Sequence, residues 1–218
     1  MQCSNLVPRG LLSLRSFAAT AFLAISASVP AVHAQAPQPP EIAARSYLLL
    51  DVTSNQILAA KDIDSPVEPA SLTKLMTAYV TFQAIEAGRI GLGSTVTIGA
   101  NPTAPVQGLS LLPGTTFTVE EALPLVLAGS INRVAEALGE AVGGPDGVGN
   151  EAFLAEMNAT ARRLGMTGTA YVNSYGWHDP RQVVTARDLA VLTQAVIRDF
   201  PQYQRFFVVR TVTIEGQE

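Results

Sequence analysis

The 218-residue chain is long enough for one domain with a substantial core, and 48% of its residues are apolar while only 15% are charged. This balance is typical of a globular interior rather than of a disordered chain. The net charge of −4 and the lack of any basic run argue against a nucleic-acid partner.

Residues 1–34 have the pattern of a secretory signal peptide. Arg9 and Arg15 supply positive charge, an apolar stretch follows, and the small residues of VHAQA offer a cleavage point after Ala34. We therefore expect the protein to be exported. The apolar stretch is short for a membrane span, which needs about 20 strongly apolar residues. A retained signal anchor remains open as an alternative.

Removal of the signal would narrow the chemistry that the chain can perform. It takes away Cys3, His33 and two arginines, so the net charge moves from −4 to −6 and His178 becomes the single histidine. Disulfides, iron–sulfur clusters, cysteine zinc sites and sites with two histidine ligands are then excluded, and a Ser-His-Asp site would depend on His178. We expect no metal and no cofactor. The chain is either an exported enzyme whose base is not histidine, or not an enzyme.

The remaining sequence predicts a mixed α/β fold. Residues 35–45 are a Pro/Ala-rich tether, and apolar runs at 47–52 and 56–60 predict a β-hairpin. A helix follows from Ser71 to about Ala87. The later elements expected, in chain order, are a strand at 94–98, a helix from a capping box at Thr118–Glu121 to about Leu127, helices over about 132–142 and 150–165, a helix opened by a second capping box at Thr185–Asp188 and ended by Pro201, and a closing strand at 206–214. Strands at both ends suggest that the two ends of this domain pair.

Ser71 and Lys74 are the candidate catalytic pair. Their helix is apolar almost all round, which is typical of a buried helix, and Lys74 is the one charge between Glu68 and Glu86. Residues three apart share a helix face, and burial lowers the pKa of a lysine, so a neutral Lys74 amine can reach the Ser71 hydroxyl. This arrangement suits a serine nucleophile activated by lysine. The alternative is that Ser71 is an N-cap and Lys74 extends to solvent.

A second serine motif, Ser130-Ile131-Asn132, lies where a small-residue turn meets a helix. A hydroxyl and an amide at such a junction can relay a proton and hold a substrate carbonyl. Ser130 and Asn132 are therefore candidate site residues. The alternative is that Ser130 is an N-cap.

Together these segments resemble the active-site serine penicillin-binding enzymes, whose motifs are Ser-x-x-Lys, Ser-x-Asn and Lys-Thr-Gly. The most similar group is the low-molecular-mass D-alanyl-D-alanine carboxypeptidases, the peptidase S11-like enzymes. The segment EPASLTKLMTAYV resembles their nucleophile motif in nearly every position, and LPG, SIN, LGM, NSYGWHDPRQ and TARDLA follow in family order over roughly residues 46–216. The resemblance implies the penicillin-binding transpeptidase/β-lactamase-like fold, an α/β fold with a mostly antiparallel sheet and a helical subdomain.

The resemblance also implies a role for each candidate residue. Ser71 would attack the bond between the two terminal D-alanines of a peptidoglycan stem peptide, with Lys74 as its base and its own amide in the oxyanion hole. Ser130 would carry the proton to the leaving D-alanine, and Asn132 would hold the substrate backbone. Water would release the acyl-enzyme, and β-lactams would acylate the same serine. The compartment implied is the periplasm or the outer face of the inner membrane.

The chain departs from the family pattern at two places. Where the family usually has Asp-Ala after Ser-x-Asn, this chain has Arg133-Val134, which alters local support more than chemistry. The third motif, Lys-Thr-Gly, does not occur, because Lys61 and Lys74 are the only lysines.

We therefore expect residues 46–218 to be an incomplete catalytic domain, the front portion of such an enzyme, and to be inactive by itself. The expected remainder holds the third motif, the further core strands and the C-terminal region with its membrane-binding helix. Membrane association would depend on that region or on a retained signal.

Three alternatives to the carboxypeptidase remain open. A class A β-lactamase shares the first two motifs, but it needs a Glu-x-x-Leu-Asn element that is not found here. A D,D-endopeptidase of peptidoglycan crosslinks and a degenerate wall-peptide-binding module without turnover are the other two. His178 and Asp179 are expected to be turn and capping residues, with a role in substrate access as the alternative.

Overall fold

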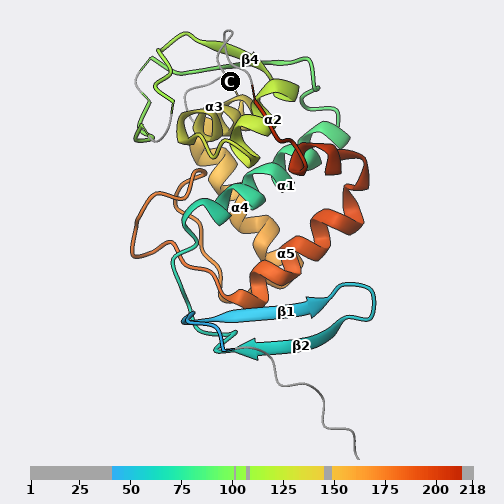
Figure 1. Cartoon of the computed structure of the whole chain (residues 1–218). Coiled ribbons are helices and arrows are strands. Elements are labelled where there is room, and N and C mark those ends of the chain that lie inside the picture. Colours follow the sequence, from blue (N-terminus) through green and yellow to red (C-terminus); the bar gives the residue numbers. More distant parts are fainter. Residues whose placement is uncertain (1–40, 101, 107–108, 145–148, 213–218) are drawn as a thin grey trace, which may run out of the picture. The chain divides into compact units, whose positions relative to one another are not determined.

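The computed structural model describes residues 41–100, 102–106, 109–144 and 149–212 (Figure 1). The predictions for residues 1–34 and for most of the tether lie outside these ranges. The elements, in chain order, are β1 (Tyr47–Asp51), β2 (Gln56–Lys61), the 3-10 turn η1 (Ala70–Leu72), α1 (Thr73–Glu86), β3 (Thr95–Thr97), β4 (Thr116–Thr118), α2 (Val119–Leu127), α3 (Asn132–Gly143), α4 (Gly149–Leu164), α5 (Ala186–Asp199) and the 3-10 helix η2 (Pro201–Phe207).

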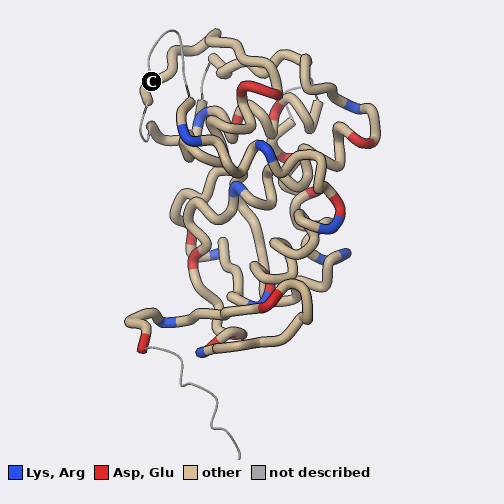
Figure 2. The backbone as a smooth tube through the Cα atoms, turned by 45° about the vertical axis from the view of Figure 1, so that its right-hand side comes forward, with Lys and Arg blue, Asp and Glu red and all other residues tan. Residues whose placement is uncertain are grey.

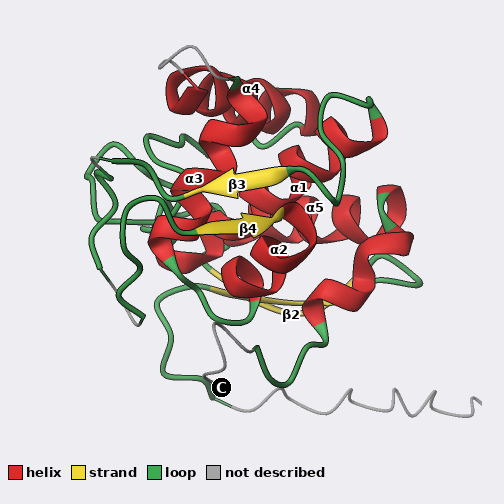
Figure 3. Cartoon of the chain, turned by 90° about the horizontal axis from the view of Figure 1, so that it is seen from above, coloured by secondary structure: helices red, strands yellow, loops and turns green. Residues whose placement is uncertain are grey.

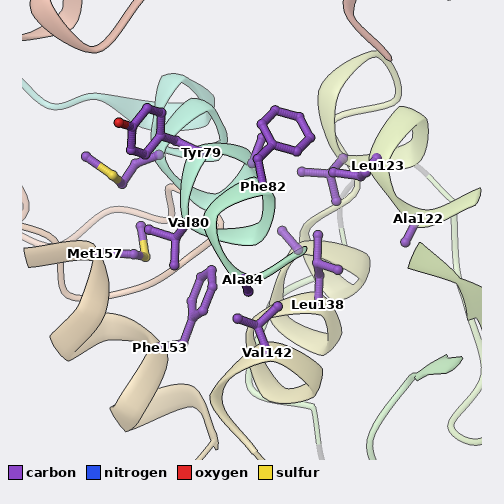
Figure 4. Close-up of a cluster of buried hydrophobic side chains, with 14 of the residues drawn as sticks. Tyr79, Val80, Phe82, Ala84, Ala122, Leu123, Leu138, Val142, Phe153 and Met157 are labelled. Atoms are coloured by element: carbon purple, nitrogen blue, oxygen red, sulfur yellow. The ribbon is translucent and has the colours of Figure 1, made fainter. Parts of the chain in front are cut away.

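Helix α1 is the most covered element of the described chain. Ten of its fourteen residues are buried, and it contacts α2, α3, α4 and α5 (Figure 1). Figure 4 shows Val80 and Phe82 between side chains of α4 on one side and of α2 and α3 on the other. Each large side chain that is fully buried here, such as Phe82, stabilises the fold by about 1.5–3 kcal/mol. The helix is therefore packed against four neighbouring helices, as its apolar sequence predicts.

The described strands form two small antiparallel sheets, β1 with β2 and β3 with β4 (Figures 1 and 3). The hairpin at 47–61 is confirmed. Its register shifts between Leu49 and Leu50, so that Leu58 is left without a partner across the hairpin. The strand expected at 94–98 is present as β3, whereas its partner β4 was not predicted. The architecture agrees with the predicted α/β class, with antiparallel sheets and a helical part.

The predicted helices are all present, but only one of the two capping boxes is complete. At the start of α2, Thr118 Oγ1 accepts from Glu121 N and Glu121 Oε2 accepts from Thr118 N. At the start of α5, Thr185 accepts from Asp188 N, but the Asp188 carboxylate instead accepts from Gly168 N and the Thr169 hydroxyl. Asp188 therefore ties α5 to the segment after α4 rather than closing its own cap.

The predicted closing strand is wrong over residues 206–212, and the expected pairing of the two ends is not found among the described residues. Phe206 and Phe207 belong to η2, and 208–212 forms no strand. The reason is aromatic packing: the Phe82 ring on α1 lies 4.6 Å from Tyr203 and 6.4 Å from Phe206, measured between centroids. A 3-10 helix begun by Pro201 places these rings on one side, which an extended strand cannot do.

Candidate active site

Ser71 lies in η1, two residues before the start of α1, and is exposed. It does not cap a helix, because the N-cap of α1 is Leu72 and η1 has no side-chain capping bond. The preceding residue, Ala70, has a φ of 46°, in the left-handed region that disfavours a residue with a Cβ. The chain is thus bent sharply just before Ser71, and the N-cap alternative for Ser71 is wrong.

Lys74 is only 2% exposed, so the alternative in which it extends to solvent is also wrong. Its Nζ donates to Asn132 Oδ1 at 2.8 Å and to the backbone oxygen of Tyr175 at 2.6 Å. Its third contact is Ser71 Oγ at 3.4 Å, along the face that the spacing predicted. Burial lowers the pKa of Lys74 from 10.5 to about 8. Near neutral pH this amine can therefore exchange a proton.

Ser130, in the turn before α3, and Asn132, the first residue of α3, meet this pair. The turn that ends α2 brings Ser130 into a left-handed conformation with a φ of 55°, and its Oγ donates to Ser71 Oγ at 2.9 Å. The N-cap of α3 is Ile131, which makes no side-chain capping bond, so Ser130 is not a cap either. Asn132 opens α3 and is 1% exposed. The structure therefore brings all four predicted site residues together.

The loop at 173–182 contributes a group that sequence reasoning missed, the Tyr175 carbonyl that accepts from Lys74. Asn173 Oδ1 accepts from the backbone amides of residues 175, 176 and 177, and buried Gln182 accepts from those of 172 and 173. The two side chains fix the path of the loop. A backbone acceptor has no sequence signature, although the Asn and Gln that hold it lie within the NSYGWHDPRQ segment.

The same loop packs closely against the chain before Ser71. Gly176 has a φ of 85°, and a Cβ added to it would lie 1.9 Å from the Ala70 oxygen. Only glycine permits this approach. The contact fixes the distance between the loop and η1, and so between the Tyr175 carbonyl and the amine of Lys74.

A cavity of about 250 Å³ opens beside Ser71, and Trp177, His178 and Glu68 are among the residues that line it. His178 Nδ1 lies 2.9 Å from Glu68 Oε2, and Trp177 is half exposed. Asp179 accepts from the amide and the guanidinium of Arg181, which lowers its pKa to about 2. The turn role expected of Asp179 is confirmed by the bond that it accepts from Arg181 N, and both His178 and Asp179 line the cavity.

Lys and Arg positions are interspersed with Asp and Glu positions along the described chain (Figure 2). Among the described residues, no group of three or more His, Cys, Asp or Glu side chains could hold a metal ion. Over the same residues no helix has the length and apolar character needed to cross a bilayer.

The chain is similar over most of its length to D-alanyl-D-alanine carboxypeptidases. The family model for Peptidase S11, D-alanyl-D-alanine carboxypeptidase, matches residues 33–215. D-alanyl-D-alanine carboxypeptidase DacC of Escherichia coli is 36% identical over 197 residues, 87% of this chain and 48% of the relative. A D-alanyl-D-alanine endopeptidase of Pseudomonas aeruginosa is 34% identical over 180 residues, 82% of this chain and 54% of the relative.

A solved structure supports the same relationship. Penicillin binding protein 6B from Escherichia coli superposes with a TM-score of 0.74 at 35% identity, over 83% of this chain and 58% of that protein. The chain spans about half the length of the curated relatives it matches.

Proposed function

The chain belongs to the peptidase S11 family of D-alanyl-D-alanine carboxypeptidases, and from that membership we propose that the protein removes the terminal D-alanine of peptidoglycan stem peptides through an acyl-enzyme. The observation that carries the proposal is the group formed by Ser71, Lys74 and Ser130. In it, a buried amine with a lowered pKa lies beside two hydrogen-bonded serine hydroxyls. Each member has a distinct task in such a reaction.

Lys74 is the base that takes the proton of the Ser71 hydroxyl. A neutral amine keeps two N–H bonds, and the two short contacts of Nζ, to Asn132 Oδ1 and the Tyr175 oxygen, can hold both of them. The lone pair is then free for the third neighbour, Ser71 Oγ. With a pKa of about 8, about one amine in ten is neutral at pH 7, against about one in 3,000 for the ordinary value of 10.5.

Ser71 attacks the carbonyl carbon of the bond between the two D-alanines, and the C–N bond breaks to leave an ester on Ser71. The proton that Lys74 has taken must reach the nitrogen of the departing D-alanine. Ser130, whose hydroxyl contacts Ser71 Oγ, carries it. The Ser71 amide stabilises the oxyanion, Asn132 holds the substrate backbone, and water then hydrolyses the ester.

The cell wall is the proposed place of action. Residues 1–34 act as an export signal, so the mature chain begins at Gln35 and works in the periplasm or at the outer face of the inner membrane. Residues 46–218 then belong to the catalytic domain. The substrate is a stem peptide ending in D-Ala-D-Ala, and β-lactams acylate Ser71 as mimics of it. Mass spectrometry of the exported protein tests the cleavage point directly.

The decisive experiment combines labelling with turnover. In the complete gene product, fluorescent penicillin should attach covalently, and D-alanine should be released from a stem pentapeptide. Ser71→Ala should abolish both without lowering the melting temperature, while Ser54→Ala, on the exposed hairpin, should change neither. Continued labelling of the Ser71→Ala variant would show that Ser71 is not the nucleophile.

A second candidate activity is D,D-endopeptidase action on peptidoglycan crosslinks, favoured by the similarity to the Pseudomonas aeruginosa endopeptidase. The same serine would perform the same acyl transfer, and only the leaving group would differ. Incubation with a crosslinked muropeptide dimer separates the two activities. Cleavage of the dimer faster than release of D-alanine from the pentapeptide would favour the endopeptidase, and labelling without either reaction would favour a binding module.

A further inference from the structure

Glu136 is a buried acid for which the proposed reaction has no use. It lies in α3, four residues after Asn132, and is 3% exposed. One of its oxygens accepts from Thr103 N at 2.9 Å and from the Thr103 hydroxyl, and both of its oxygens accept from Ala104 N at 3.1 Å. None of the ion pairs found among the described residues involves it. All of these bonds go to one short segment, residues 102–106.

Segment 102–106 contacts the two groups that accept from Lys74. Pro105 O accepts a long contact, 3.5 Å, from Asn132 Nδ2, and the Oδ1 of the same amide accepts from Lys74. The Tyr175 carbonyl accepts from Lys74. Burial raises the pKa of the Tyr175 hydroxyl and the Thr103 side chain lowers it, so Thr103 lies near that hydroxyl. Segment 102–106 therefore contacts Asn132 through the Pro105 oxygen and lies beside Tyr175 through Thr103, and both residues bind the same amine.

We propose that Glu136 is a positioning residue for Lys74: its carboxylate anchors segment 102–106, which holds in place the Asn132 amide and Tyr175, the two partners of the lysine amine. The role of Lys74 as a base rests on the proposed function, whereas the anchoring does not. A carboxylate suits this task because it accepts several bonds at once, here from two backbone amides and one hydroxyl.

The anchored segment also affects how easily Lys74 gives up its proton. Burial is the cause of the lowered pKa of Lys74, so release of the segment would admit water and raise that pKa toward its ordinary value. The negative charge of Glu136 raises the pKa values of Tyr175 and of Glu140, in each case after burial as the larger cause. Glu140 and Tyr175 are thus the described titratable groups whose pKa values the charge of Glu136 raises.

The lysine content of the chain makes a direct measurement possible. Lys61 and Lys74 are its only lysines, so incorporation of lysine labelled with carbon-13 at Cε gives two NMR signals, and Lys61→Arg assigns them. In Glu136→Ala the titration midpoint of Lys74 should rise by about one pH unit. In Glu136→Gln it should stay near that of the parent, because the amide oxygen can still accept from Thr103 and Ala104.

Glu140→Ala is the matched control. Glu140 lies one turn along the same helix, is half buried and accepts from Asn150 Nδ2 at 2.9 Å, away from Lys74. Its removal should lower stability but leave the midpoint of Lys74 unchanged. Thr103→Val removes one hydroxyl that donates to Glu136 and serves as the second variant if Glu136→Ala fails to fold. It should raise the titration midpoint of Lys74 by less than Glu136→Ala does.

Acylation by fluorescent penicillin, measured in the complete gene product, gives an independent readout. Glu136→Ala should acylate about 10- to 100-fold more slowly and Glu140→Ala within about twofold of the parent. An unmoved Lys74 midpoint in both Glu136→Ala and Thr103→Val would overturn the inference, as would equal losses in the Glu136 and Glu140 variants. A shifted midpoint in a protein that never acylates would instead refute the proposed function and leave the anchoring intact.

Discussion

The two lysines of the chain lie in regions that differ in burial, one on an exposed hairpin and one on a buried helix. Lys61 ends β2 on the exposed hairpin and donates one bond, to the Ala44 oxygen at 2.8 Å. Lys74 is the second residue of the buried helix α1 and contacts three acceptors. Both segments are apolar in sequence, yet α1 is covered by four helices while Leu49 and Leu58 of the hairpin are 56% and 52% exposed. Cover from the surrounding elements, not the residue type, gives a lysine an unusual pKa.

The largest expected difference between the two regions comes from the same substitution made in each. Lys74→Arg should reduce penicillin acylation by about a thousandfold or more, because guanidinium cannot give up its proton at a relevant pH. Lys61→Arg should leave the rate within about twofold. Acylation kinetics of both variants in the complete gene product provide the measurement. If Lys74→Arg kept most of the rate, Lys74 would not be the base.

Two glycines with a similar positive φ, Gly176 and Gly165, separate the effect of close packing from the effect of backbone strain. Gly176→Ala forces a Cβ against the Ala70 oxygen, so we expect acylation to fall about 10- to 100-fold. Gly165, at the end of α4, has a similar φ of 80° but nothing within 4 Å of an added Cβ. Gly165→Ala should therefore cost about 1 kcal/mol of stability and leave acylation unchanged. Equal acylation losses in the two variants would argue against the loop contact.

The pH dependence of acylation tests the lowered pKa of Lys74. The folded-state pKa is below the ordinary value, so the amine becomes neutral above about pH 8 rather than above 10.5. Acylation should rise about tenfold per pH unit below pH 8 and level off above it. Lys61→Arg serves as the control and should give the same curve. A plateau reached only above pH 10 would mean that Lys74 titrates as an ordinary lysine.

The smallest effect is expected on the hairpin. Leu58→Ala removes a half-exposed side chain that has no cross-strand partner, and should change stability by less than about 0.5 kcal/mol. The same change at fully buried Leu138 in α3 should cost about 2–5 kcal/mol. Thermal unfolding of the chain compares the two. A stability loss for Leu58→Ala as large as that for Leu138→Ala would mean that the hairpin side chain is buried against other parts of the protein.

Much of the fold and the centre of the site could be predicted because they depend on local rules. The spacing of Ser71 and Lys74 follows from helix geometry, and the cap of α2 follows from Thr118 and Glu121. The closing strand could not be predicted, because an apolar run near Phe206 fits a strand or a packed helix equally well and its distant partner Phe82 decided between them.

The supporting groups of the site were beyond sequence reasoning for a related reason. Glu136 lies on α3 one turn from Asn132 and one turn from Glu140, and an acid in this position gives no sign of which backbone amides it binds. The Tyr175 carbonyl is a group that every residue carries. Such supports depend on where a loop lies in space, which local spacing does not specify.

The backbone at Ser130 has a consequence for how this protein responds to selection. A φ of 55° is unfavourable for serine and easy for glycine. Laboratory evolution that rewards heat resistance alone should therefore drift toward glycine at position 130, while selection that also demands activity should keep the hydroxyl. Sequences recovered from the two regimes would reveal how much stability this chain forgoes to retain a serine there.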